Sequence, residues 1–249
     1  MNLLLVNDDG IDSPALQLLC RAAAARGHRV TVVAPSTQQS AKGHSFTVFT
    51  PVTVHERTVE GADRAWAVDG TPVDCTRLGL LELCRDAEMV ISGINAGLNA
   101  GLAVYVSGTV GAAREASFVR KPSMAVSMQT GTPEETLRFF ADWAVALAER
   151  LKAYPFPDQA VLNVNVPAVP MWELQPPVMC PISREPWVDG YVRRESPRGG
   201  DYFWLLPESF DAPHTPGSDM DWLGRKHITC TFLTPEGCDQ AAYADLLDF

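Results

Sequence analysis

The sequence has no long hydrophobic run and few basic residues. Nowhere do about 18 apolar residues follow one another, so we expect no membrane-spanning segment and no membrane partner. The first residues lack the basic-then-apolar pattern of a signal peptide, which predicts a cytoplasmic protein. The 30 acidic and 20 basic side chains give a net charge of −10, which disfavours binding to duplex nucleic acid or to anionic membranes. A small phosphorylated substrate stays compatible, because a bound cation can supply positive charge locally.

The patterns that mark common metal and cofactor sites are also missing. The six cysteines include no Cys-x-x-Cys pair, so no zinc knuckle is expected, and we expect these thiols to be reduced and mostly buried. The five histidines include neither His-x-His nor His-Glu-x-x-His. No Gly-x-Gly-x-x-Gly follows a predicted strand, which disfavours a dinucleotide-binding fold. The rest of the composition, 46% hydrophobic in 249 residues, is that of a globular protein with a sizeable core.

Short apolar strands alternate with helical segments over the first 170 residues. Strands are predicted at residues 3–6, 28–35, 88–93, 122–128 and 160–167, and helices at residues 12–27, 73–84, 107–119 and 133–154. Two alternating stretches, residues 46–59 and 64–70, predict an extended hairpin or an excursion from the main fold. This rhythm predicts an α/β fold with a doubly wound, mainly parallel sheet.

Beyond residue 170 the sequence changes character. Prolines and tryptophans become frequent, helical periodicity fades, and short apolar runs occur at residues 202–206 and 227–233. We therefore divide the chain into a core over residues 1–170 and a C-terminal part over residues 171–249, made of β-hairpin extensions and a terminal helix at residues 239–249. Such segments either form subunit contacts or pack onto the main domain, and the residues leave both readings open.

Two adjacent carboxylates, Asp8 and Asp9, directly follow the first apolar strand and precede Gly10. In a parallel sheet this point lies at the carboxyl edge, where such folds bind ligands. Two like charges side by side resist ionisation unless a cation or hydrogen-bond donors are supplied. A polar turn with a solvated acid pair is the alternative, so the residues after the other strands must decide.

Short oxygen donors follow those strands as well. They are Ser40 after the second strand, Asn95 and Asn99 in a glycine-rich loop, and Ser107, Gly108 and Thr109 at a helix start. Each has a structural explanation by itself, as a loop residue, a turn residue beside glycine or an N-cap. Together, carboxylate, amide and hydroxyl oxygens suit Mg²⁺ or Mn²⁺, and a helix start suits a phosphate. Their collection at one edge therefore predicts a metal and phosphate site.

Five stretches resemble, in order, the successive motifs of the SurE family. They are VNDDGIDSPAL, APSTQQSAKGHSFT, VDGTPVDCTRLGL, VISGINAGLNAG and SGTVGAAREA, and weaker echoes follow in LNVNVP, SPRGGDYFWL and HITCTFLTP. SurE proteins are stationary-phase survival proteins that act as divalent-metal-dependent 5′/3′-nucleotidases and form dimers or tetramers through C-terminal extensions. The resemblance implies a Rossmann-like, SurE-type fold, a phosphatase core over residues 1–170, a nucleoside monophosphate substrate, and a homodimer or homotetramer built with residues 171–249.

The resemblance also assigns site residues. It places one divalent ion, Mg²⁺ or Mn²⁺, on Asp8, Asp9, Ser40 and Asn95, and the phosphate on Asn99, Ser107 and the amides of Gly108 and Thr109. Asp8 or Asp9 would orient or deprotonate the attacking water, a role that the sequence does not divide between them. With Asn99 and Ser107, these two aspartates form the expected catalytic set. No histidine is placed for general acid catalysis, so the leaving oxygen would be stabilised by the metal or protonated by solvent.

The sequence departs from the family pattern at three alanines. Ala15 and Ala41 stand where the family usually has glycine, Ala103 stands where an aspartate is common, and residues 217–222 match the family's TDxxA stretch only loosely. If position 41 requires a positive φ, the loop that carries Ser40 changes conformation. These departures leave open an oligomeric nucleotide-binding protein with weak or no turnover.

Two other phosphate-handling classes fit less well. A response-regulator receiver domain would need an acceptor aspartate and a lysine where the third and fifth strands end, and those strands end in SGIN and VSM. An aspartate-nucleophile phosphatase would need an Asp-x-Asp motif, whereas Asp8 and Asp9 are adjacent. Both classes are disfavoured.

Overall fold

The computed structural model describes residues 1–186, 190–206 and 214–235. The strands are β1 (Asn2–Val6), β2 (Arg29–Pro35), β3 (Val54–Arg57), β4 (Arg64–Val68), β5 (Met89–Ala96), β6 (Ser123–Met128), β7 (Val161–Val166), β8 (Gln175–Met179), β9 (Gly190–Glu195), β10 (Asp201–Leu206) and β11 (His227–Leu233). The helices are α1 (Pro14–Ala25), α2 (Pro72–Leu78), α3 (Gly108–Phe118), α4 (Glu134–Leu151) and α5 (Asp219–Gly224). A π-helical turn (Gly79–Leu83) follows α2, and two 3-10 turns (Gly101–Tyr105 and Met171–Glu173) complete the described elements.

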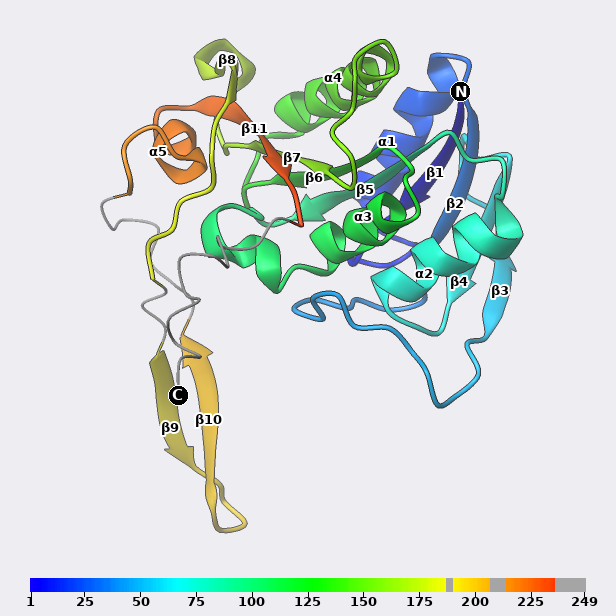
Figure 1. Cartoon of the computed structure of the whole chain (residues 1–249). Coiled ribbons are helices and arrows are strands. Elements are labelled where there is room, and N and C mark those ends of the chain that lie inside the picture. The colour runs from blue at the N-terminus through cyan, green and yellow to red at the C-terminus, as the bar shows by residue number, and fades with distance from the viewer. Residues whose placement is uncertain (187–189, 207–213, 236–249) are drawn as a thin grey trace, which may run out of the picture.

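Nine strands form one sheet in the order β3-β4-β2-β1-β5-β6-β7-β11-β8, as Figure 1 shows. Strands β4, β2, β1, β5, β6 and β7 run parallel, whereas β3 pairs antiparallel with β4 and β11 pairs antiparallel with β7. The predicted α/β fold with a mainly parallel sheet is therefore confirmed. Of the alternating residues 46–59 and 64–70, only the short hairpin β3–β4 is strand.

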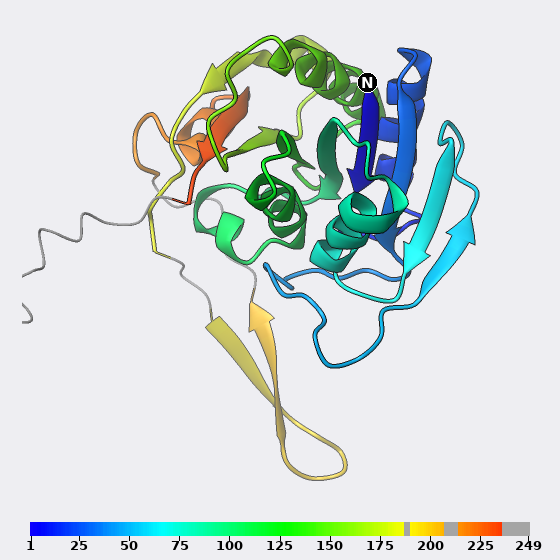
Figure 2. The same ribbon diagram turned by 45° about the vertical axis from the view of Figure 1, so that its right-hand side comes forward.

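Helices cover both faces of the sheet, because alternate residues of each strand point to opposite sides. On β1, Leu3 and Leu5 face the cluster that includes the buried side of α1 and α4, whereas Leu4 and Val6 face the cluster formed with α2 and α3. Figures 1 and 2 show these two pairs of helices on opposite sides of the strands. The sheet is therefore doubly wound, and its hydrophobic core has two layers, one on each face of the sheet.

Local signals explain where the helices begin. Ser13 is the N-cap of α1 and accepts a hydrogen bond from Leu16 N at 3.5 Å, with Pro14 in the first turn. Thr71 and Asp74 form a reciprocal capping box at the start of α2. These caps orient each helix directly after the loop that leaves the carboxyl edge of the sheet.

Residues beyond 170 contribute to the main sheet as well as to a projecting hairpin. Strands β11 and β8 widen the sheet past β7, and only β9 and β10 form a separate antiparallel pair (Figure 1). This pair confirms the predicted hairpin extension. The predicted terminal helix at residues 239–249 lies outside the described residues, and the boundary at residue 170 stays a prediction.

Two further expectations concern burial. Cys20, Cys75, Cys84 and Cys230 are free and buried, in agreement with the expected reduced thiols. No helix among the described residues is long and apolar enough to cross a membrane.

Candidate active site

The acid pair lies in a tight turn at the end of β1. The Asn7 amide Nδ2 donates to Gly10 O at 2.8 Å, and Gly10 N donates to Asn7 Oδ1 at 3.2 Å, so Asn7 closes the turn around the two aspartates. Asp8 is only 4% exposed, and Asp9 is partly buried. A solvated polar turn therefore does not describe Asp8.

The start of α3 rests against Asp8. Thr109 Oγ1 donates to Asp8 Oδ1 at 2.5 Å. A Cβ on Gly108 would lie 3.1 Å from Asp8 Cβ and 3.2 Å from Asp8 Oδ2, so glycine allows this close approach. Ser107 is the buried N-cap, and its Oγ accepts from Val110 N at 3.1 Å. The first N–H groups of a helix have no acceptor within the helix, so this end of α3 can bind an anion beside the acid pair.

Loops after β2 and β5 also meet the acid pair. Gln39 N donates to Asp8 O at 2.7 Å, and Ala96 N donates to Asp9 Oδ2 at 3.1 Å. The Asn95 amide nitrogen donates to Gly97 O at 2.7 Å, so the amide oxygen is the atom left to act as a ligand. Ser40 is exposed, follows Gln39, and accepts from Gln38 Nε2 at 3.1 Å. The structure thus brings three loops together, with Ser40 linked to Asp8 through its neighbour.

The acid pair carries charge that the described part of the chain does not neutralise. Burial raises the pKa of Asp8 to about 6, and the charge of Asp9 adds to this effect. Burial also raises the pKa of Asp9. Among the ion pairs of the described residues, none involves Asp8 or Asp9. A cation at this point would therefore be held by uncompensated carboxylates.

The donor set suits a hard cation rather than zinc. Over residues 1–186, 190–206 and 214–235, no group of three or more His, Cys, Asp or Glu gathers as a metal site. The expected ligands contain only two such residues, and the neutral oxygens of Ser40 and Asn95 complete the set. Carboxylate, amide and hydroxyl oxygens are the donors that Mg²⁺ and Mn²⁺ prefer.

Asn99 lies in a second polar group, the amide cluster of Asn99, Ser127, Asn163 and Asn165. Asn99 N donates to Asn165 Oδ1 at 2.8 Å, and Asn99 Nδ2 donates to Ser127 Oγ at 2.9 Å. Its carbonyl accepts from Asn163 Nδ2 at 2.7 Å and from Asn165 Nδ2 at 3.1 Å. Among the described residues, no hydrogen bond joins Asn99 to Asp8 or Asp9, so its catalytic role stays a prediction.

Residues that the sequence analysis did not single out hold the loops in place. Glu115 on α3 binds His44 at 2.9 Å and Arg77 at 2.6 Å, which ties the loop of Ser40 to α3. Asp219 accepts from Gly101 N at 2.8 Å and so fixes the segment between β5 and α3. Two features of the sequence could have revealed such polar groups. One is a glutamate, Glu115, in an Ala-rich helix, and the other is the alternation of Asn163 and Asn165 with apolar residues in one strand.

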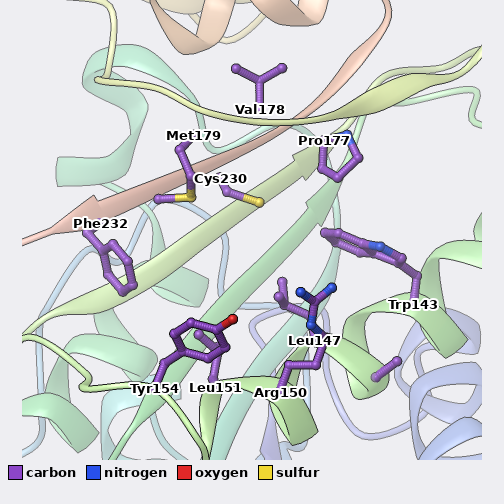
Figure 3. Close-up of a pocket in the computed structure, with 11 residues that line it drawn as sticks. Trp143, Leu147, Arg150, Leu151, Tyr154, Pro177, Val178, Met179, Cys230 and Phe232 are labelled. Atoms are coloured by element: carbon purple, nitrogen blue, oxygen red, sulfur yellow. The ribbon is translucent and has the colours of Figure 1, made fainter.

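An apolar cavity lies away from the acid pair. It measures about 500 Å³ and lies between α4 and the strands β8 and β11, where Figure 3 shows Trp143, Tyr154 and Phe232 around it. Arg150 is its one charged lining residue, and none of the predicted site residues lines it. Its lining offers a metal or a phosphate far fewer polar groups than the carboxyl edge does.

Comparisons with known proteins show the family of this chain. A family model described as "Survival protein SurE" matches residues 3–189, which is most of the chain. The chain belongs to the SurE family. This confirms the resemblance found in the motifs, and the acid pair and the start of α3 both lie inside the matched SurE region.

Curated SurE relatives match along nearly the whole chain. A protein named 5′-nucleotidase SurE from Desulfovibrio desulfuricans is 45% identical over 239 residues, covering 94% of this chain and 92% of that protein. Its namesake from Maridesulfovibrio salexigens is 40% identical over 250 residues, covering 99% and 98%. A crystal structure of the SurE protein from Aquifex aeolicus superposes with a TM-score of 0.82 at 28% identity, covering 100% of this chain and 98% of that one. The SurE-type fold is thereby confirmed.

Proposed function

We propose that this chain hydrolyses nucleoside 5′-monophosphates, and also 3′-monophosphates, to nucleoside and phosphate with the help of one divalent cation, Mg²⁺ or Mn²⁺. The broader part of this statement, a nucleotidase of the SurE type, rests on curated relatives that carry the name 5′-nucleotidase along the whole chain. The observation that carries the finer part is an acid pair, with Asp8 buried and Asp9 partly buried, that has no ion-pair partner among the described residues and lies beside the start of α3.

Asp8, Asp9, Ser40 and Asn95 would hold the cation. The raised pKa of Asp8 supports this set, because burial makes its ionised form costly until a positive charge is supplied. A bound cation supplies Lewis-acid polarisation of the phosphoryl group and neutralises charge in the transition state.

The chain's own groups bind and orient the phosphate. The first-turn amides of Gly108 and Thr109 would donate hydrogen bonds to a phosphate at the start of α3. Ser107 Oγ accepts from Val110 N, so its hydroxyl hydrogen is available for a phosphate oxygen. One N–H of the Asn99 amide binds Ser127, which leaves its second N–H for the same phosphate.

The two aspartates take different parts in this proposal. Asp8 is nearly buried and is held by Thr109, whereas Asp9 is more exposed and is oriented by a backbone amide from β5. Asp9 therefore orients the attacking water and accepts its proton, and Asp8 keeps the negative charge at the centre of the site.

We place the enzyme in the cytoplasm as a homodimer or homotetramer that is built with residues 171–249. The hairpin β9–β10 supports this assembly, since its large apolar side chains are exposed; they include Tyr191, Phe203, Trp204 and Leu205. Exposed apolar groups that lie together mark interaction surfaces.

A nucleotide-binding protein with weak turnover is the second candidate, and Ala41 favours it. Ala41 has φ 57°, so the residue after Ser40 holds a left-handed conformation that alanine adopts at a cost. A strained ligand loop would lower metal affinity and with it the rate of hydrolysis.

Phosphate release tests the proposal. Nucleoside monophosphates of all bases are incubated with Mg²⁺, Mn²⁺ or EDTA and with wild type, Asp9→Ala or Asp158→Ala, whose aspartate is exposed and lies before β7. We expect release that requires metal, vanishes in Asp9→Ala and persists in Asp158→Ala. Release that ignores both EDTA and Asp9→Ala would contradict the mechanism. Metal and nucleotide binding without release would favour the binding protein.

A further inference from the structure

A polar pocket adjoins the acid pair on the side of β2 and β4. It has a volume of about 430 Å³ and lies between the loop after β2 and the turn that joins β4 to α2. Ser36, Thr37 and Gln39 line it from the loop, and Asp69, Gly70 and Thr71 line it from the turn. The volume suits a small organic molecule, and the lining offers hydroxyl, amide and carboxylate groups together with the ammonium group of Lys42.

One wall of this pocket contacts the proposed metal site, and the other contacts the proposed phosphate site. On one wall, Gln39 N donates to Asp8 O at 2.7 Å. On the other, Thr71 leads into Pro72, which lies so close to α3 that a Cβ on Gly108 would be 3.1 Å from Pro72 Cγ. A substrate whose phosphate binds at the start of α3 therefore has this pocket as room for the rest of its structure.

Asp69 stands on the wall farther from the acid pair. It follows β4, and the end of β4 is tied to the end of β2 by the bond from Ser36 N to Val68 O at 2.8 Å. Since β2 lies between β4 and β1, two strand spacings, about 10 Å, separate the backbone at Asp69 from that at Asp8. An interval of this length leaves room for a ribose between the two residues.

The carboxylate of Asp69 has capacity for a ligand. Its side chain is 52% exposed, and His55 Nε2 lies 3.0 Å from Oδ2. The neighbouring Ser36 hydroxyl and then His55 lower the pKa of Asp69, so the group stays ionised. A carboxylate offers about four acceptor positions, which leaves room for two hydroxyl donors.

We propose that this pocket holds the nucleoside and that Asp69 accepts hydrogen bonds from the ribose 2′- and 3′-hydroxyls of a 5′-monophosphate. The inference rests on the proposed nucleotidase function and adds a specificity residue to it. A 5′-monophosphate presents both hydroxyls free, whereas in a 3′-monophosphate one of the two carries the ester. Asp69 therefore favours 5′- over 3′-monophosphates and ribonucleotides over deoxyribonucleotides.

The test compares substrates that differ at the diol. Phosphate release from 5′-AMP, 3′-AMP and 2′,3′-dideoxy-5′-AMP is measured with wild type, Asp69→Asn and the control Asp158→Asn. In wild type we expect kcat/KM to fall at least about tenfold from 5′-AMP to the dideoxy compound, mainly through KM, because hydrogen bonds to a charged group are lost. In Asp69→Asn the two substrates should differ by less than about threefold, with the dideoxy rate unchanged. Asp158→Asn should keep the wild-type ratio, and the preference for 5′-AMP over 3′-AMP should shrink only in Asp69→Asn.

Nucleoside binding gives a second readout that needs neither metal nor turnover. Calorimetric titration in EDTA should show tighter binding of adenosine than of 2′,3′-dideoxyadenosine by wild type, and equal binding of both by Asp69→Asn. The inference is overturned if Asp69→Asn keeps the wild-type ratio in either assay, or if wild type does not distinguish the diol at all. Absence of phosphate release by wild type from every substrate would instead count against the proposed function, and the titration would then decide the role of Asp69.

Discussion

Two polar clusters lie at the carboxyl edge of the same sheet and differ in how their polar groups are satisfied. The acid pair of Asp8 and Asp9 holds two carboxylates with hydrogen bonds from Thr109 and Ala96 but without an ion-pair partner among the described residues. The amide cluster of Asn99, Ser127, Asn163 and Asn165 is neutral and buried, and four hydrogen bonds join its members, while the buried Asn163 Oδ1 has no partner among the described residues. Neutral polar groups that satisfy one another stabilise a fold, whereas buried charges without partners destabilise it.

The clusters are joined by residues 95–109, and this connection gives the amide cluster its place in function. The segment leaves Asp9 at Ala96, is fixed by the amide cluster at Asn99 and by Asp219 at Gly101, and returns to Asp8 at Thr109. The neutral cluster thus holds the middle of a segment whose two ends contact the acid pair. A local cost in stability is expected where a ligand completes the site.

The largest expected effect comes from Asp8→Asn, which removes the charge and keeps the shape of the side chain. Activity should fall at least about 1,000-fold, because the proposed metal site loses a charged ligand. At pH 8 in EDTA, the free energy of unfolding should rise by about 1–3 kcal/mol, because a folded-state pKa raised to about 6 makes ionised Asp8 destabilising. Urea unfolding and phosphate release measure both changes.

The pH dependence of this gain has a definite sign. The folded-state pKa of Asp8 is raised from 3.8 to about 6, so the wild type loses stability as the pH rises through this interval. The gain from Asp8→Asn should be full above about pH 6 and absent near pH 4. Added Mg²⁺ should stabilise wild type and not the variant. A variant that loses stability at both pH values would show that the two clusters do not differ as described.

A stability change of opposite sign, without the large loss of activity expected for Asp8→Asn, is expected from Asn165→Leu in the amide cluster. The change removes two hydrogen bonds and leaves Asn99 N buried without an acceptor, which should lower the free energy of unfolding by about 2–3 kcal/mol. Because the acid pair is intact, Mg²⁺ should still raise the melting temperature of this variant.

Asn2→Leu serves as the control for that measurement, since the Asn2 amide makes an exposed hydrogen bond to Asp86. Its cost should stay within about 0.5 kcal/mol. If Asn165→Leu were as stable as wild type, or more stable, the amide cluster would not stabilise the fold. It would then resemble the acid pair, as a group of polar side chains that a ligand has to complete.

The sequence predicts features that depend on neighbouring residues, and those that follow because the loops after parallel strands meet at one edge of the sheet. Ser13 and Pro14 mark the start of α1, and the residues after β1 and β5 meet as expected. It also predicts that position 41 matters if φ is positive there, and Ala41 indeed has φ 57°.

Features that depend on distant pairing were not predicted. Strand β11 joins the main sheet beside β7, about 65 residues earlier in the chain, and nothing in its local pattern encodes that partner. The bonds from Glu115 to His44 and Arg77, and the bonds within the amide cluster, join segments that approach one another only in the folded chain. A single sequence shows each of these residues as an isolated polar group, so their partnership becomes visible only with the structure.

The smallest expected effect is that of Ala41→Gly in the loop that carries Ser40. This variant tests whether backbone strain at position 41 lowers the free energy of unfolding in addition to the charges of Asp8 and Asp9. An alanine in the left-handed region destabilises the fold by about 1 kcal/mol, and glycine removes this strain. Because glycine also makes the unfolded chain more flexible, about half of the gain is lost, so the variant should be about 0.5 kcal/mol more stable than wild type. Ala24→Gly on α1 is the matched control and should lose about 1 kcal/mol, because glycine weakens a helix. Urea unfolding of both variants gives the two signs directly. If Ala41→Gly loses stability as Ala24→Gly does, the cost on the acid side lies in the two carboxylates alone. If Ala41→Gly gains stability and binds Mg²⁺ more tightly, strain in the loop of Ser40 accounts for part of the lost stability.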